Sequence, residues 1–193
     1  IGTQSPLTVT QMLWVNLIMD TFAAMALASL PPSEAVMQNK PRDRKAFIIN
    51  PSMSRQIIGV GGLFFILLLG LLYMLEYAPI NSMTDLLTWY PTGPRELTNH
   101  ELSIFFTVFV MLQFWNMFNA RAFATGKSTF HFKDCKGFGI IVLVIFIGQI
   151  IIVQFGGKMF NVTPLCLTDW IAIIVVTSLV LWVGELLRLI NRK

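Results

Sequence analysis

Residues 14–20 decide the fold: they read WVNLIMD and place an asparagine and an aspartate inside an otherwise apolar stretch. The stretch, Leu7–Leu30, is long enough to cross a bilayer as a helix, and Pro31-Pro32 stops it. A carboxylate at that depth costs several kcal/mol and is a candidate ion or proton site. Asn16 and Asp20 are four residues apart, so an α-helix puts both side chains on one face.

The composition excludes a water-soluble bundle. Of 193 residues, 55% are hydrophobic and 12% charged, and the mean hydropathy is +0.68. The pI of about 9.3 does not indicate a nucleic-acid partner, because the basic residues cluster between apolar segments, as they do in membrane proteins. The chain starts at Ile1 without an initiator Met or a signal-peptide pattern, so we expect a piece of a longer protein.

Five apolar segments have the length of bilayer-spanning helices. The predicted fold class is therefore all-α: a polytopic membrane protein with five transmembrane helices and the lipid bilayer as its main partner. The predicted helices cover approximately residues 7–30, 56–77, 102–120, 137–155 and 169–190.

Basic residues predict the orientation of the chain. Only Arg95 and Lys158 lie in the connections on one side, and the other twelve of the fourteen lie on the opposite side. Because cytoplasmic loops carry the excess of Lys and Arg, we expect an extracytoplasmic N-terminus and a cytoplasmic C-terminus. The twelve are Lys40, Arg42, Arg44, Lys45, Arg55, Arg121, Lys127, Lys133, Lys136, Arg188, Arg192 and Lys193.

Two further polar side chains, Gln113 and Asn116, are three residues apart and share a helix face. They fit two hypotheses equally well: hydrogen bonding between helices, or membership of a site. Oxygen donors from Asp, Asn and Gln suit a hard cation better than zinc or copper. Calcium takes 6 to 8 oxygens. Asp20 and Asn16 cannot supply that number, so residues outside this chain must complete the site.

Charged residues near the helix ends suggest no further site. Glu185 is expected to pair with Arg188 one turn later. Asp85 and Asp169 are expected to be solvated loop or cap residues, and His100 has no partner at ligand spacing.

Several stretches of the chain resemble a known family. Residues 11–24, QMLWVNLIMDTFAA, closely resemble the sixth transmembrane helix of P-type calcium ATPases of the plasma-membrane type. The similarity continues through Pro31-Pro32 and residues 39–42 (NKPR), and returns at residues 113–121 (QFWNMFNAR), which resemble the eighth helix. In order and loop length the chain resembles helices six to ten of a ten-helix membrane domain.

The resemblance implies that Asn16 and Asp20 coordinate calcium, the transported ion, with Gln113 and Asn116 as possible secondary ligands. Two-site relatives carry Thr at the position of Met19 and Glu at the position of Gln113, so this chain is expected to belong to a one-calcium pump. The pump would reside in the plasma membrane. Calcium and manganese both accept oxygen ligands, so the residues leave that choice open.

The resemblance also implies what lies elsewhere in the parent. Helices one to five, the remaining ligands and the domains that use ATP and magnesium would belong to the missing N-terminal part, so this fragment alone should not hydrolyse ATP. The alternative is a self-contained five-helix channel subunit or assembly scaffold, in which Asp20 would line a pore. A phosphorylation motif upstream would decide for the pump.

Overall fold

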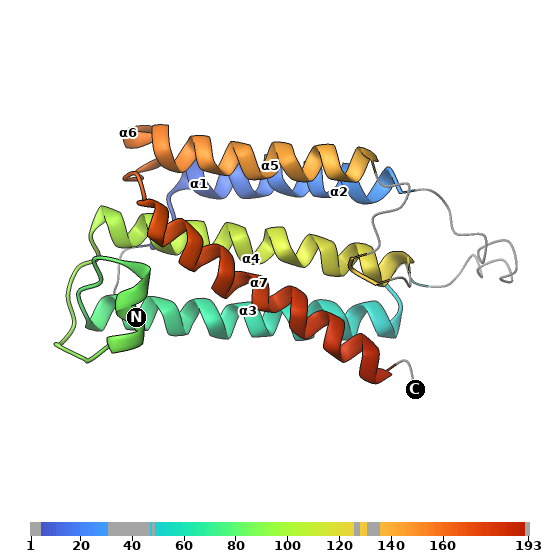
Figure 1. The fold of residues 1–193 in the computed structure, drawn as a ribbon, viewed down its shortest axis with the longest axis horizontal. Coiled ribbons are helices and arrows are strands. Elements are labelled where there is room, and N and C mark those ends of the chain that lie inside the picture. Colours follow the sequence, from blue (N-terminus) through green and yellow to red (C-terminus); the bar gives the residue numbers. More distant parts are fainter. Residues whose placement is uncertain (1–4, 31–46, 48, 126–127, 131–135, 192–193) are drawn as a thin grey trace, which may run out of the picture.

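The computed structural model describes residues 5–30, 47, 49–125, 128–130 and 136–191. These residues form helices and connecting segments, and five of the helical stretches are long and apolar enough to cross a membrane. The predicted all-α, five-helix fold class is confirmed. The spans run roughly along the long axis of the molecule, with the last one crossing the others obliquely (Figure 1). They are Val9–Ala28, Pro51–Tyr77, Asn99–Phe123, Lys136–Phe155 and Leu167–Arg188.

The first span is a composite helix. It begins with α1 (Val9–Leu13), passes through a π-helical turn, η1 (Trp14–Met19), and continues as α2 (Asp20–Ala28). Thr8 caps its start: its side chain accepts from the backbone of Gln11, whose side chain accepts from the backbone of Thr8 in return. Pro31 and Pro32, predicted to end this helix, lie outside the described residues.

The second span, α3 (Pro51–Tyr77), starts earlier than the hydropathy predicts. Asn50 caps the helix by accepting from the backbone of Met53 at 2.7 Å, and Pro51 occupies the first turn, where its missing N–H costs nothing. The helix is followed by a short 3-10 helix, η3 (Met83–Thr88).

The third span, α4 (Asn99–Thr125), is the central helix of the bundle and carries much of the buried core. It continues beyond the predicted end at residue 120. Arg121, expected in a loop, is 2% exposed, and its guanidinium lies 5.0 Å from the ring centroid of Phe138. Burial of the aliphatic stem and this ring contact explain why a basic residue remains inside the helix.

The remaining helices that the structure describes are α5 (Lys136–Phe155), the single-turn α6 (Gly157–Phe160) and α7 (Leu167–Asn191). Of these, α5 and α7 pack against α4, and the short α6 contacts α5 and α1. Figure 1 shows α1 and α2 alongside α5, while α7 lies against α4. The indole of Trp115 donates to Thr177 at 3.1 Å, and the amide of Asn119 donates to the Val180 carbonyl at 3.0 Å, which joins α4 to α7.

The predicted pairing of Glu185 with Arg188 is confirmed at 2.7 Å. Glu185 also accepts from Ser128 and from Thr129, so it ties the segment after α4 to the end of α7. Arg188 extends this network by donating to Asn119. Glu185 and Arg188 are therefore hydrogen-bonded within the fold.

The described basic residues separate to two ends of the bundle. The segments joining α3 to α4 and α5 to α7, which contain Arg95 and Lys158, lie at one end, and the C-terminal end of α7 lies at the other (Figure 1). Eight of the twelve residues that predict the cytoplasmic side lie outside the described residues: Lys40, Arg42, Arg44, Lys45, Lys127, Lys133, Arg192 and Lys193.

Candidate cation site

A pocket of about 570 Å³ lies among α2, α3 and α4. Most of its lining is apolar, and four polar side chains interrupt it. These are one carboxylate, from Asp20, and three amides, from Gln56, Gln113 and Asn116. The structure therefore brings together three of the four residues that the sequence singled out.

Asp20 is the first residue of α2 and directly follows the π turn. Its backbone N–H bonds to the carbonyl of Val15, five residues back, instead of to Asn16 as it would in an α-helix. Within the part of the chain that the structure describes, its carboxylate makes no hydrogen bond and no ion pair. A carboxylate without a partner inside the fold is available to bind an external ligand.

Asn16 is exposed but does not line this pocket. The sequence predicted that Asn16 and Asp20 share a face because it assumed an unbroken α-helix. The π turn spans residues 14–19, so the phase expected from α-helical spacing does not hold between the two side chains. Their use in one site stays a prediction.

Gln113 and Asn116 line the same pocket, as their spacing on α4 predicts. The alternative was that they hold helices together by hydrogen bonds. In the described residues neither side chain makes such a bond, whereas Trp115 and Asn119 on the same helix do. This division indicates that α4 presents two amides to the pocket while its other face binds α7.

Sequence reasoning missed Gln56. It was taken as the edge of an apolar segment, whereas α3 already begins at Pro51, so Gln56 lies inside the helix and is half-buried in the pocket lining. The signal that could have found it is the Asn50-Pro51 pair, a cap followed by an N1 proline, which moves the helix start upstream.

The donor set has the chemistry of a hard-cation site but not the number of ligands. One carboxylate and three amides are oxygen donors, as calcium prefers, but they fall short of 6 to 8. Among the described residues no group of three or more His, Cys, Asp or Glu side chains could hold a metal ion. Any cation bound at Asp20 needs further ligands.

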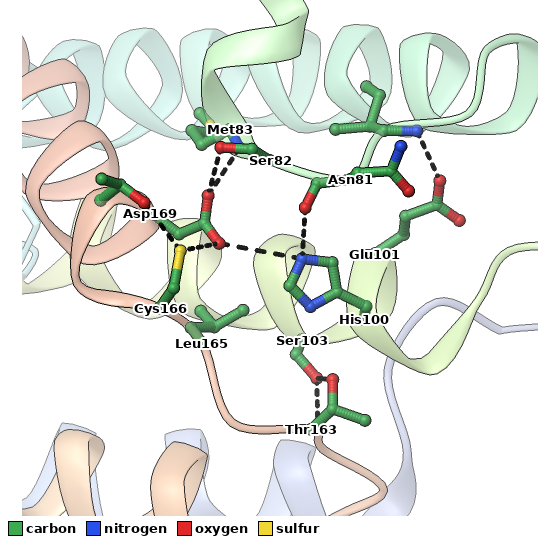
Figure 2. Close-up of polar contacts among 12 residues, drawn as sticks. Asn81, Ser82, Met83, His100, Glu101, Ser103, Thr163, Leu165, Cys166 and Asp169 are labelled. Atoms are coloured by element: carbon green, nitrogen blue, oxygen red, sulfur yellow. Dashed lines mark hydrogen bonds and ion pairs between the residues drawn. The ribbon is translucent and has the colours of Figure 1, made fainter.

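A second polar cluster forms where η3, α4 and α7 meet, and it corrects one expectation. Asp169 is fully buried rather than solvated. Its carboxylate accepts from the Ser82 hydroxyl and the Met83 backbone, both at 2.8 Å, and from the Cys166 thiol at 3.0 Å (Figure 2). His100 lies 3.8 Å from the same carboxylate. Sequence spacing could not reveal this cluster, because its members come from three separate elements.

Glu101, the neighbour of His100, is satisfied in the same way. Its carboxylate accepts from the backbone of Ile80 at 3.0 Å and of Thr98 at 2.8 Å, and it pairs with Arg95. These contacts fix the loop before α4 to the end of α3. Both acids at this end have structural roles that Asp20 does not share.

The class of the protein follows from these observations: it is a helical membrane domain in which the Asp20 carboxylate, without a partner among the described residues, shares a pocket with three amides. Residues 4–190 match the family model described as "Cation transporting ATPase, C-terminus", and the chain belongs to this family of P-type ATPase membrane domains. The resemblance stated from residues 11–24 is thereby confirmed.

Relatives place the chain more closely. It is 39% identical to plasma membrane calcium-transporting ATPase 2 of Oreochromis mossambicus over 86% of its length, and 37% identical to plasma membrane calcium-transporting ATPase 1 of Homo sapiens over 96%. It is also 37% identical to calcium-transporting ATPase PAT1 of Dictyostelium discoideum over 95%. The chain spans 15–16% of the length of these relatives. Membership of this family favours the pump over the channel subunit or scaffold.

Proposed function

We propose that this chain is the C-terminal membrane part of an ATP-driven calcium efflux pump, and that it supplies Asp20 and Asn16 to a single calcium site. The observation that carries the proposal is the pocket among α2, α3 and α4, where the Asp20 carboxylate lies with Gln113 and Asn116 and has no partner within the described residues. Calcium is the ion named for the relatives, and it matches the oxygen donors.

The π turn supports the same proposal. Breaks in regular helical bonding frequently occur at functional sites. In transporters they leave backbone carbonyls available to coordinate ions near the middle of the bilayer. Here the break immediately precedes the candidate carboxylate, and Asn16 lies within it. Carbonyls of η1 are therefore further candidate ligands for the ion.

The rest of the coordination shell, and the domains that use ATP and magnesium, belong in this proposal to other parts of a longer protein. ATP hydrolysis there would move Asp20 and Asn16 between a high-affinity state open to the cytoplasm and a low-affinity state open to the outside. A proton on the emptied carboxylate would return in exchange, because an uncompensated charge in the bilayer is costly.

Calcium stoichiometry tests this proposal. Equilibrium binding of radioactive calcium to the full-length protein should titrate to about one ion per molecule, since the donors described here suffice for only part of one shell. Asp20→Asn should remove this binding. Two ions per molecule, one of them eliminated by Gln113→Ala, would contradict the single site. Manganese competition in the same assay decides between the two ions.

The orientation is part of the proposal. In this proposal the pump lies in the plasma membrane with its C-terminus in the cytoplasm, so Lys136 faces the cytoplasm and Lys158 the outside. Both side chains are exposed, Lys136 at the start of α5 and Lys158 just after its end. In a protein whose cysteines are replaced by serine, an impermeant thiol reagent added to intact cells should label Lys158→Cys but not Lys136→Cys. Labelling of both, or of Lys136→Cys alone, would contradict this topology.

A further inference from the structure

We propose that Gln149 and Gly148 of α5 are positioning residues for the cation site. They hold Trp14 against α5, and Trp14 fixes the start of the π turn that contains Asn16 and ends at Asp20. The proposal deepens the proposed function and rests on it. Neither glutamine nor glycine touches the ion pocket, so their effect would pass through Trp14.

The first contact is a hydrogen bond inside the bundle. The indole Nε1 of Trp14 donates to Oε1 of Gln149 at 3.0 Å, and Gln149 is 1% exposed. Water does not replace a lost partner at this depth of an apolar bundle, so the bond constrains the indole strongly. The Gln149 Nε2 group has no acceptor among the described residues. Among the described residues, the hydrogen bond that this buried amide makes is the one to Trp14, which indicates that Gln149 serves to hold the indole in place.

The second contact is steric. A Cβ placed on Gly148 would lie 2.8 Å from Cη2 of Trp14, closer than real Cβ contacts come. The absence of a side chain at Gly148 therefore lets the indole lie directly on the α5 backbone. Gly139, on the same helix, has nothing within 4 Å of such a Cβ. The steric requirement for glycine therefore holds at the position beneath Trp14 and not at Gly139.

The first span contacts α6 before the π turn and α5 after it. Before it, the buried side chain of Gln11 donates to the Phe160 carbonyl of α6 at 2.8 Å. After it, Ser29 lies close to Gly137, where an added Cβ would come within 3.2 Å of its hydroxyl. The Asp20 carboxylate has no hydrogen bond or ion pair to any residue that the structure describes. The position of Asp20 is therefore set by the backbone of the first span, which α5 and α6 hold in place.

Trp14 is the place where this control acts, because it is the first residue of η1. Upstream of Trp14 the helix follows α-helical bonding, within η1 the bonds span five residues, and α-helical bonding resumes in α2. Holding Trp14 fixes where the extra residue enters the helix. If the indole were released, the turn could close in α-helical register and rotate Asp20 relative to α4. The ligand side chains would still be present, but their positions relative to one another would change.

The test is a double-mutant cycle in the full-length protein, with calcium-dependent phosphorylation by ATP as the assay. Gln149→Leu removes the acceptor, and Trp14→Phe removes the donor. Each should raise the calcium concentration for half-maximal phosphorylation about tenfold, as loss of a group that orients a metal ligand does, while phosphorylation at saturating calcium persists. The double variant should match the single variants within about twofold, because both remove one interaction.

Glycine variants test the steric contact independently. Gly148→Ala should weaken calcium affinity by at least about tenfold in the parent protein. In the Trp14→Phe background the same change should have less than about a twofold effect, because phenylalanine lacks the atom nearest to the added methyl group. Gly139→Ala and Gln154→Leu are matched controls on α5: the first adds a methyl group in open space, and the second removes a 2.8 Å bond to Leu165. Both should leave calcium affinity unchanged.

Hydrogen exchange separates failure of this inference from failure of the proposed function. Backbone amides of residues 14–20 should exchange faster in Gln149→Leu than in Gln154→Leu, with or without calcium. If Asp20→Asn leaves calcium dependence intact, the proposed function fails, whatever the exchange shows. If Asp20→Asn abolishes calcium dependence, two outcomes would overturn the positioning role. In the first, Gln149→Leu and Trp14→Phe change neither calcium affinity nor hydrogen exchange. In the second, their separate effects on calcium affinity multiply in the double variant.

Discussion

Asp20 on α2 and Asp169 on α7 are both aspartates within apolar spans, and they differ in every contact. Asp169 is fully buried and accepts three hydrogen bonds, from Ser82, Met83 and Cys166. Asp20 is exposed to the pocket among α2, α3 and α4, and its carboxylate has no partner within the described residues. Their surroundings differ as well. Asp169 joins three well-packed elements, whereas Asp20 follows a break in helical bonding.

The comparison teaches that depth in an apolar segment does not by itself identify a functional acid. A buried carboxylate that is fully hydrogen-bonded holds the fold together, and removing it leaves its donors unsatisfied. An acid in the same kind of segment without internal partners lacks that structural explanation and is the better candidate for ion binding. Glu101, which accepts from Ile80 and Thr98 and pairs with Arg95, belongs with Asp169.

The largest expected effect is on activity. Asp20→Asn keeps the shape of the side chain and removes its charge, so it should abolish calcium-dependent phosphorylation of the full-length protein without reducing expression. Asp169→Asn is the matched variant and should retain calcium dependence in the molecules that fold. The measurement is the calcium-dependent phosphoenzyme per milligram of purified protein. The opposite result for the two variants would reverse the roles assigned here.

Substitution of the same two aspartates should affect the stability of the fold in the reverse order. Asp169→Ala leaves the Met83 N–H and the Ser82 hydroxyl without their acceptor and should lower the free energy of unfolding by about 3 kcal/mol. Asp20→Ala removes no hydrogen bond between described residues and should change the free energy of unfolding by less than about 0.5 kcal/mol. Thermal and denaturant unfolding in detergent measure both. Equal destabilisation by the two variants would show that Asp20 has a structural partner.

Smaller effects on calcium affinity should show which amides belong to the cation site. Asn16→Ala removes one proposed ligand and should weaken calcium affinity about tenfold, whereas Gln113→Ala should weaken it by less than about threefold. The structure makes this test informative, because Gln113 lines the pocket and Asn16 does not. Half-saturating calcium in the phosphorylation assay gives the order. A larger effect of Gln113→Ala would move the site towards α4.

Hydropathy predicted the five spans but not their ends. It detects the apolar centre of a helix, while caps decide where the helix starts: Asn50 with Pro51 begins α3 inside a polar segment. At the end of α4, Arg121 remains in the helix because Phe138, from α5, covers it. The first signal is local and readable in the sequence. The second depends on a contact between two helices and is not.

The site was partly predictable for the same reason. Helical spacing brought Gln113 and Asn116 to one face, and the cost of a carboxylate in a bilayer singled out Asp20. The π turn gave no sequence signal, since residues 14–19 contain neither glycine nor proline. Its anchor is a residue 135 positions away, so only the packed bundle reveals it.

The sequence by itself determined the class of protein, because apolar length, an intramembrane carboxylate and the string QMLWVNLIMDTFAA are properties of consecutive residues. It also determined which donors could bind a hard cation, since their oxygen chemistry does not depend on folding. Only the tertiary structure decided which acids are available, because that depends on partners supplied by other helices. Asp169 is satisfied by groups from η3 and the start of α7, whereas Asp20 faces a pocket. Hydrogen bonds between distant segments draw this distinction, and they exist only once the bundle has packed.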